Sequence, residues 1–407
     1  MTTTEASDSV DSSDAADAAD AAKLVDFPLR QAGEPLPPHQ YAEFREREGL
    51  VWSTMPTGAR VWLVTRYKDV REVLTHPKIS SNPAHEGFPS PGRTGGPPAQ
   101  DQVPGWFAAL DPPEHDRYRK VLIPEFSVRR IKELRPRIQE VVEDCVEALL
   151  AKGSPADLVS DFAVPIPSLV ICALLGVPQV DRGFFESRIR CLVMLDATDE
   201  ERDEASKQIL RYFSRMIAIR KRRPGDDLIS VMIQSETMTP MEIGGAAMLL
   251  VIAGQETTAN NIALGASTLL SNPRWIGDDR VVEELLRYYS VADLVPLRVA
   301  LEDVEVAGQV IKAGEGIAPL VAAANHDGSA FACPHQFDPG REERHHIAFG
   351  FGRHLCLGAH LVRTEMELAY RTLFERIPTL ELARPDEELA FRNNGVLFGL
   401  DSLPVRW

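Results

Sequence analysis

The sequence predicts a mainly α-helical fold with a smaller β region, and three observations support that prediction. Apolar residues recur at helical spacing through most of the stretch from Glu114 to Pro273. One helix within it begins at Pro240 and is long enough to cross the core of the molecule. Short strand patterns occur at 51–65 and 303–323.

The first elements of the chain are a predicted hairpin and a short helix. Residues 51–65 indicate two strands around a turn at Thr57-Gly58, the second of them buried. A helix is expected from Tyr67 to Thr75, because Pro77 cannot continue it. The Gly/Pro/Ser-rich stretch 80–105 is too long for an idle connector, and such loops are usually functional or mobile.

The long helix has well-marked ends. Thr239, Pro240 and Glu242 combine an N-cap, a first-turn proline and a capping-box glutamate. The helix can run to about Leu270, before Ser271-Asn272-Pro273, which is roughly 45 Å at 1.5 Å per residue. Because its middle is apolar on nearly every side, we expect it to be buried.

Composition bounds the domain organisation. The 407 residues are 44% hydrophobic, enough for a large core, and the net charge of −16 disfavours nucleic-acid binding. Residues 1–22 hold six acidic residues and no basic one. We therefore expect 1–26 to be a disordered acidic Ala/Asp/Ser tail and 27–407 to form a single domain.

Cysteine usage and hydropathy indicate a cytoplasmic protein. The five cysteines include no C-x-x-C pair, which argues against a disulfide framework, a zinc ribbon or an iron–sulfur cluster. A reducing, cytoplasmic compartment fits this pattern. With no secretory h-region and no run of eighteen apolar residues, neither secretion nor a membrane span is predicted.

One of these cysteines has an informative context. Cys356 follows the glycine-rich run from Phe349 to Leu355, and helical apolar spacing begins directly after it. The N–H groups and dipole of a helix N-terminus favour a thiolate there, and Arg353 and His354 are expected to add positive potential. A loop-held thiolate suits an axial ligand of haem iron. The alternative is a buried structural cysteine.

The ten residues from Phe349 to Gly358 resemble the cysteine-ligand loop of the cytochrome P450 family. This resemblance spans nearly the whole chain after about residue 27 and includes further motifs in the expected order. It implies a cytochrome P450 fold whose long central helix crosses the haem. It also implies a haem b with an axial thiolate from Cys356, the metal ligand, and cofactor contacts from Phe349 and Gly358.

The middle of the long helix carries a second motif, Ala253 to Thr258. An acid and two hydroxyls in an apolar helix interior are costly unless they are bonded or useful. They can form a polar patch satisfied by neighbouring helices. The resemblance implies instead an oxygen-activation motif, in which Gly254 leaves room for dioxygen, Thr257 donates a hydrogen bond at the oxygen site and Glu256 relays protons.

Two further motifs are assigned to support. Glu284 and Arg287 share one helix face at i, i+3, either as an exposed pair or, as the resemblance implies, as a buried ion pair that braces the cysteine loop. The resemblance also implies cations for the haem propionates, since carboxylates take charge-assisted hydrogen bonds. The predicted propionate partners are His115, Arg119, Arg298 and His354.

A basic cluster stands out in an otherwise acidic protein. It can be an ordinary solvated helix face, but on the resemblance it lies on the cysteine side of the haem. We therefore expect it to dock an acidic ferredoxin, supplied by a ferredoxin reductase, through electrostatic steering. Its members are Arg117, Arg119, Lys120, Arg129, Arg130, Lys132, Arg135 and Arg137.

These observations predict a haem-thiolate monooxygenase that inserts one oxygen atom from dioxygen into a small hydrophobic organic substrate, by hydroxylation or epoxidation, in natural-product tailoring. The alternatives are a peroxygenase or oxidative coupling enzyme of the same fold, and a non-catalytic haem-binding sensor. No nucleic acid or membrane partner is expected. The predicted substrate-pocket residues are Met248, Leu249, Ala253, Leu294, Val295, Leu297, Val396 and Leu397.

Overall fold

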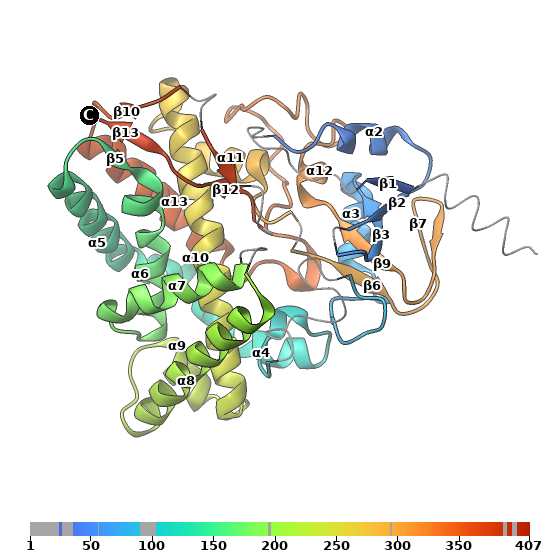
Figure 1. Cartoon of the computed structure of the whole chain (residues 1–407), viewed down its shortest axis with the longest axis horizontal. Helices are drawn as coiled ribbons and strands as arrows, with labels where there is room; N and C mark the ends of the chain where they lie inside the picture. Colours follow the sequence, from blue (N-terminus) through green and yellow to red (C-terminus); the bar gives the residue numbers. More distant parts are fainter. Residues whose placement is uncertain are drawn as a thin grey trace, which may run out of the picture.

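The computed structural model describes residues 24–26, 36–55, 57–89, 103–193, 197–293, 295–385, 389–392 and 397–407. The predicted tail, 1–26, therefore lies almost wholly outside the described residues, as do 90–102 of the predicted long loop. The structure divides into a large helical side and a smaller β-rich side, as predicted (Figure 1).

Most of the helices gather on one side, whereas α2, α3 and α12 lie with the strands (Figure 1). Several short helical turns connect them, among them η7 (Gly352–His354). The α-helices are α2 (Gln40–Glu46), α3 (Tyr67–Thr75), α4 (Glu114–Leu122), α5 (Val128–Lys152), α6 (Pro165–Leu175), α7 (Arg182–Val193), α8 (Asp199–Arg222), α9 (Leu228–Gln234), α10 (Pro240–Ser271), α11 (Val281–Tyr289), α12 (Val321–Asn325) and α13 (Ala359–Arg376).

The strands form one six-stranded sheet in the order β1-β2-β3-β9-β6-β4, the three-stranded sheet β10-β13-β5, and the pairs β7-β8 and β11-β12. Their bounds are β1 (Leu24–Asp26), β2 (Val51–Thr54), β3 (Arg60–Val64), β4 (Ile79–Ser80), β5 (Ala156–Asp157), β6 (Arg298–Ala300), β7 (Val304–Val306), β8 (Gln309–Ile311), β9 (Gly316–Pro319), β10 (Glu381–Leu382), β11 (Phe391–Arg392), β12 (Gly399–Leu400) and β13 (Pro404–Arg406).

The predicted N-terminal hairpin and short helix are confirmed. Strands β2 and β3 pair antiparallel with Trp52 opposite Trp62, and the two rings stack with centroids 4.2 Å apart. Helix α3 occupies the expected residues, Tyr67–Thr75. The stretch 303–323 is only partly as predicted, because its last residues belong to α12, which begins at Val321.

The long helix α10 is the central element of the fold. It begins with the predicted capping box, in which the Thr239 and Glu242 side chains each accept from the other's backbone N–H. Its side chains are buried over most of its length, where it packs against α6, α8 and α13 (Figure 1). Among the described residues, no helix combines the length and apolar character that a membrane span needs.

Candidate active site

The loop before Cys356 has the bent backbone that its glycines predict. Gly350 and Gly352 both have φ of 75°, a left-handed conformation that side chains with a Cβ rarely adopt. A Cβ at Gly352 would lie 2.6 Å from Cγ2 of Thr75, so the loop passes tightly over the end of α3. The Cys356 N–H then donates to the Phe349 carbonyl at 2.8 Å. The loop thereby folds back on itself and presents the sulfur two residues before Gly358, the N-cap of α13.

The surroundings of the Cys356 thiol act on its pKa in both directions. The residue is exposed, as is Cys333, whereas Cys145 and Cys172 are buried. The protein around the thiol still desolvates it, and this burial raises its pKa. A hydrogen bond from the Gly358 N–H and the charges of Arg119 and Arg363 act in the opposite direction.

The positive potential expected from Arg353 and His354 is not found. Burial, followed by repulsion from Arg298, lowers the pKa of His354 to about 3, so its ring is neutral. The Arg353 guanidinium lies 3.6 Å from the Asp116 carboxylate on the surface. The charges that lower the pKa of the Cys356 thiol come instead from Arg119 on α4 and from Arg363, seven residues after the cysteine on α13.

The predicted propionate partners converge on one place. The rings of His115 and His354 lie with centroids 4.2 Å apart, and both Arg298 and Arg119 act electrostatically on His354. Arg119 donates to the Leu355 carbonyl at 2.9 Å, beside the cysteine. Four residues from α4, β6 and the cysteine loop are therefore brought together, as the sequence predicted.

Two members of this group have nitrogen atoms that could hold an anion. Arg298 is buried and donates to the Leu297 carbonyl at 2.8 Å, and within the described residues no carboxylate lies within 4 Å of it. Burial lowers the pKa of Arg298 to about 10. Nε2 of His115 is also buried and, within the described chain, has no hydrogen-bond partner, whereas Nδ1 of the same ring lies 2.9 Å from the Asp116 carboxylate. A haem propionate fits the Arg298 guanidinium directly, and it fits Nε2 of His115 when that nitrogen carries a proton.

Helix α10 exposes one short face at its middle. Ala253 is exposed, and Ile252, Gly254 and Thr257 are half-buried, although the helix is buried on both sides of this stretch. The Thr257 hydroxyl donates to the Ala253 carbonyl at 2.7 Å, one turn earlier. This bond competes with the helix ladder and leaves the hydroxyl oxygen able to accept from a bound group.

Gly254 lies between the open face of α10 and a neighbouring helix. A Cβ at this position would lie 3.5 Å from the Ile171 side chain on α6, an ordinary packing distance. The residue is also half-buried beside the exposed Ala253. The room for dioxygen expected at Gly254 stays a prediction.

Glu256 has a partner that the sequence did not reveal. Its carboxylate is nearly buried and lies 3.3 Å from Nη1 of Arg392 on β11. Arg392 in turn contacts the Asp401 carboxylate at 3.1 Å. Nothing in the local sequence of Arg392 distinguishes it, because the contact spans 136 positions of the chain.

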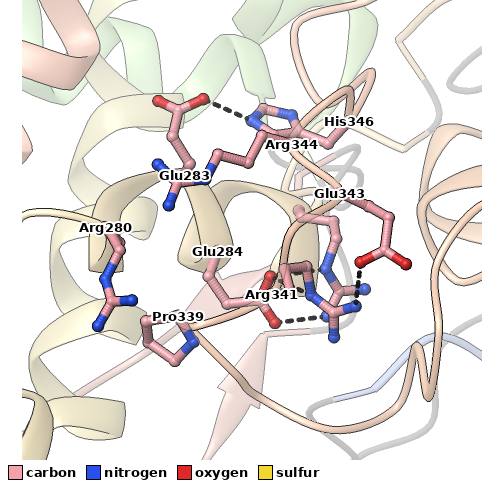
Figure 2. A pocket seen from close by; sticks show the side chains of 9 residues that line it. Arg280, Glu283, Glu284, Pro339, Arg341, Glu343, Arg344 and His346 are labelled. Atoms are coloured by element: carbon pink, nitrogen blue, oxygen red, sulfur yellow. Dashed lines mark hydrogen bonds and ion pairs between the residues drawn. The ribbon is translucent and has the colours of Figure 1, made fainter.

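The Glu284–Arg287 pair is buried, as the resemblance implied, and it is part of a larger cluster. Both oxygens of Glu284 accept from Arg287 at 2.8 Å, and Arg341 donates to the same carboxylate at 2.9 Å. Figure 2 shows this carboxylate facing Arg341 in a recess, a pocket that Glu283 and His346 also line. The recess is a cluster of ion pairs and lies apart from the open face of α10.

The cluster connects to the cysteine loop through Asn325. Arg287 donates to the Asn325 carbonyl at 2.8 Å, and the Asn325 side-chain oxygen accepts from the Ile347 N–H at 2.8 Å. The Ile347 carbonyl then accepts from the Gly350 N–H at 2.8 Å. This continuous path is consistent with a bracing role for the ion pair.

The predicted substrate-pocket residues differ in solvent exposure. Ala253 and Val295 are exposed and Leu397 is half-buried, whereas Leu249 and Leu297 are buried. The structure does not support Met248, which has no exposed surface and packs within the main core. Leu294 and Val396 lie outside the described residues.

The predicted docking cluster is largely neutralised by acidic neighbours. Carboxylate partners occur for Arg117 (Glu242, 2.6 Å), Arg129 (Glu133, 3.1 Å), Arg130 (Asp226, 3.0 Å) and Arg135 (Glu367, 2.5 Å). Within the described residues, Lys120, Lys132 and Arg137 lack a carboxylate within 4 Å. The positive surface is therefore smaller than the sequence suggested.

Comparison with known proteins agrees with this geometry. The family model described as Cytochrome P450 matches residues 279–399. Pentalenic acid synthase of Streptomyces avermitilis is 42% identical over 383 residues, which cover 91% of this chain and 94% of that protein. The chain is thus similar along nearly its whole length to a natural-product enzyme.

Solved structures show the same similarity in three dimensions. Mycinamicin VIII C21 methyl hydroxylase from Micromonospora griseorubida, crystallised with mycinamicin VIII, has a TM-score of 0.87 at 36% identity and covers 94% of this chain and 100% of that one. CYP105P1 in complex with filipin I also has a TM-score of 0.87 at 36% identity, covering 94% and 99%.

Proposed function

The chain belongs to the cytochrome P450 family and is a monooxygenase, and from that premise we propose that it hydroxylates or epoxidises a small hydrophobic natural product. In the overall reaction, substrate, dioxygen, two electrons and two protons yield the oxygenated product and one water. The proposed donor is a ferredoxin with its ferredoxin reductase. The absence of disulfides among the five cysteines supports a cytoplasmic location.

Members of this family bind haem through a cysteine thiolate, and we assign that ligand to Cys356. The Arg298 guanidinium and a protonated Nε2 of His115, with Arg119 and His354 beside them, would hold the propionates of a haem b. Phe349 and Gly358 complete the loop that carries the sulfur. When bound, haem supplies the oxygen chemistry, and the protein supplies ligand, orientation and protons.

The proposed proton-handling residues are Thr257 and Glu256. Thr257 lies on the open face of α10, where its hydroxyl oxygen can accept at the oxygen site. To donate there, the hydroxyl must first release the Ala253 carbonyl. Glu256 is the next residue back along the helix, and its carboxylate can exchange a proton. This pair favours a dioxygen-dependent monooxygenase, because an enzyme that uses peroxide does not need protons delivered for the cleavage of dioxygen.

The substrate class rests on the apolar open face and on the relatives. Ala253, Val295 and Leu397 are apolar and accessible, and such surfaces bind hydrophobic ligands. Pentalenic acid synthase, the mycinamicin hydroxylase and the filipin-bound structure bear the names of different compounds. We therefore propose the class, a hydrophobic natural product, and no single compound.

The single observation that carries this proposal is the accessible Cys356 thiol in its glycine-bent loop beside the cation group. The test is the spectrum of the reduced holoprotein with carbon monoxide. We expect a strongly red-shifted Soret band, absent in Cys356→Ser and retained in Cys333→Ser, a variant of an exposed cysteine elsewhere. A red-shifted band in Cys356→Ser would refute the assignment.

A further inference from the structure

The acid of the oxygen-activation motif depends on one distant side chain. Glu256 projects from the buried middle of α10, and 9% of its side chain is exposed. Among the described residues, the Glu256 carboxylate has one polar contact, with Nη1 of Arg392 at 3.3 Å. A nearly buried carboxylate needs a cation or hydrogen-bond donors to remain charged and in one position.

Arg392 belongs to a hairpin that packs against the face of α10 that carries Glu256. Strands β11 and β12 pair antiparallel with Arg392 opposite Gly399. A Cβ at Gly399 would lie 2.1 Å from Oδ1 of Asn260, so the hairpin backbone approaches α10 as closely as glycine allows. Asn260 follows Glu256 by one helical turn, on the same face. The hairpin thus contacts this face at two points one turn apart.

The hairpin itself is held in place by contacts on its other side. Phe398 stacks on Phe391 with centroids 5.5 Å apart, and its ring also stacks with Tyr289 at 6.3 Å. The Phe398 N–H donates to the Val291 carbonyl at 3.0 Å. Asp401 contacts the Arg392 guanidinium at 3.1 Å. Both the backbone and the guanidinium group of Arg392 are therefore held by contacts that do not involve Glu256.

We propose that Arg392 is a positioning residue, which fixes the Glu256 carboxylate beside Thr257. The close packing of Gly399 on Asn260 determines how far the Arg392 side chain extends toward Glu256. The inference rests on the proposed role of Glu256 as the proton-exchanging acid. Arg392 touches neither substrate nor haem in this role. It acts through the orientation and the charge of one carboxylate.

The first experiment follows where electrons go when the holoprotein reduces dioxygen. With a surrogate plant ferredoxin, its reductase and no added substrate, the fraction of electrons recovered as hydrogen peroxide is measured. We expect Arg392→Gln to raise this fraction at least about threefold, since misplaced proton delivery releases peroxide. Arg392→Lys keeps the positive charge, so its peroxide fraction should be close to that of the parent. Arg406→Gln, which breaks an exposed arginine–glutamate pair on β13, is the matched control and should change nothing.

A double-mutant cycle separates this inference from the proposed function. If Arg392 acts through Glu256, Arg392→Gln adds nothing in a Glu256→Gln background, and the two changes are also non-additive in unfolding free energy. A raised peroxide fraction in Glu256→Gln alone, with Arg392→Gln unchanged, overturns the inference and leaves the function standing. No change in Glu256→Gln overturns the proposed role of Glu256 itself.

The packing of Gly399 on Asn260 provides an independent test that keeps Arg392 intact. Gly399→Ala should push the hairpin off Asn260 and raise the peroxide fraction as Arg392→Gln does. Adding Asn260→Ala removes the clashing amide, whose nitrogen has no hydrogen-bond partner within the described residues, and should return the fraction toward that of the parent. If Gly399→Ala leaves the peroxide fraction unchanged, the packing of Gly399 on Asn260 does not determine the position of Arg392.

Discussion

The charge cluster around Glu284 offers the sharpest test of what holds the cysteine loop. The perturbation is Glu284→Gln, which keeps the shape of the side chain and removes its charge. In the structure, the carboxylate accepts four hydrogen bonds at 2.8–2.9 Å, from Arg287 twice, from Arg341 and from the Asp338 N–H. A glutamine amide places N–H donors against guanidinium donors, so at least one buried cation loses its partner.

The magnitude follows from burial. Side-chain exposure is 2% for Glu284, 1% for Arg287 and 6% for Arg341, so solvent cannot replace the lost contact. Breaking a buried pair by removing one partner costs about 3–5 kcal/mol. For a chain of 407 residues, each kcal/mol lowers Tm by about 1.2 °C, so we expect a decrease of about 4–6 °C.

The assay combines unfolding with the state of the cysteine ligand. Chemical denaturation gives the free energy of unfolding, and the carbon monoxide spectrum during heating shows when thiolate ligation is lost. We expect the red-shifted band of Glu284→Gln to disappear before global unfolding, because Asn325 transmits the loss to the loop. Glu133→Gln, which removes exposed pairs with Arg129 and Arg130, is the control and should leave the unfolding free energy and the band close to those of the parent. A cost below about 1 kcal/mol for Glu284→Gln, or loss of the band only on global unfolding, would refute the reasoning.

Three further predictions follow from single contacts. Burial works to raise the pKa of Glu283, but hydrogen bonds from His346 and Arg363 lower it to about 2, so the stabilisation is present above pH ~4.5 and is lost as pH falls toward 2. The stability gap between the parent and Glu283→Gln should therefore shrink between pH 5 and 3 in denaturation titrations. Gly254→Ala should keep its haem and stabilise α10 by up to about 1 kcal/mol, because its Cβ finds ordinary contact with Ile171; loss of haem would contradict this. Lys120→Glu should slow reduction by an acidic ferredoxin and weaken its salt dependence more than Arg129→Glu, whose parent side chain is already paired; equal effects in stopped-flow reduction would argue against a docking surface at Lys120.

Elements with local signals could be predicted from the sequence. The capping box at Thr239 and the proline at 240 gave the start of α10, and the turn at Thr57-Gly58 gave the β2–β3 hairpin. The positive φ of Gly350 and Gly352 follows from glycines placed before a helix. In each case the physical cause lies within a few residues of its effect.

Features that depend on distant residues could not be predicted. The charge at His354 follows from burial beside Arg298, which lies on β6, so counting basic residues near Cys356 assigned the positive field to the wrong groups. Four of the eight members of the basic cluster on α4 and α5 have carboxylate partners, and three of the four have one outside these helices, such as Glu367 on α13. The orientation of Gly254 toward α6 needs the packing of two helices, which a motif does not encode.

Two carboxylates of this chain illustrate how contacts determine a role. Glu284 accepts four hydrogen bonds within the described residues, which occupy its oxygens and fix its position. Glu256 has one partner among the described residues, Arg392 at 3.3 Å, so its remaining acceptor sites are available to water or to a neighbouring hydroxyl. Both acids recruit an arginine from a later segment of the chain. The saturated acid is therefore suited to bracing and the singly paired acid to proton exchange, and this difference in saturation is the physical basis for assigning them opposite roles.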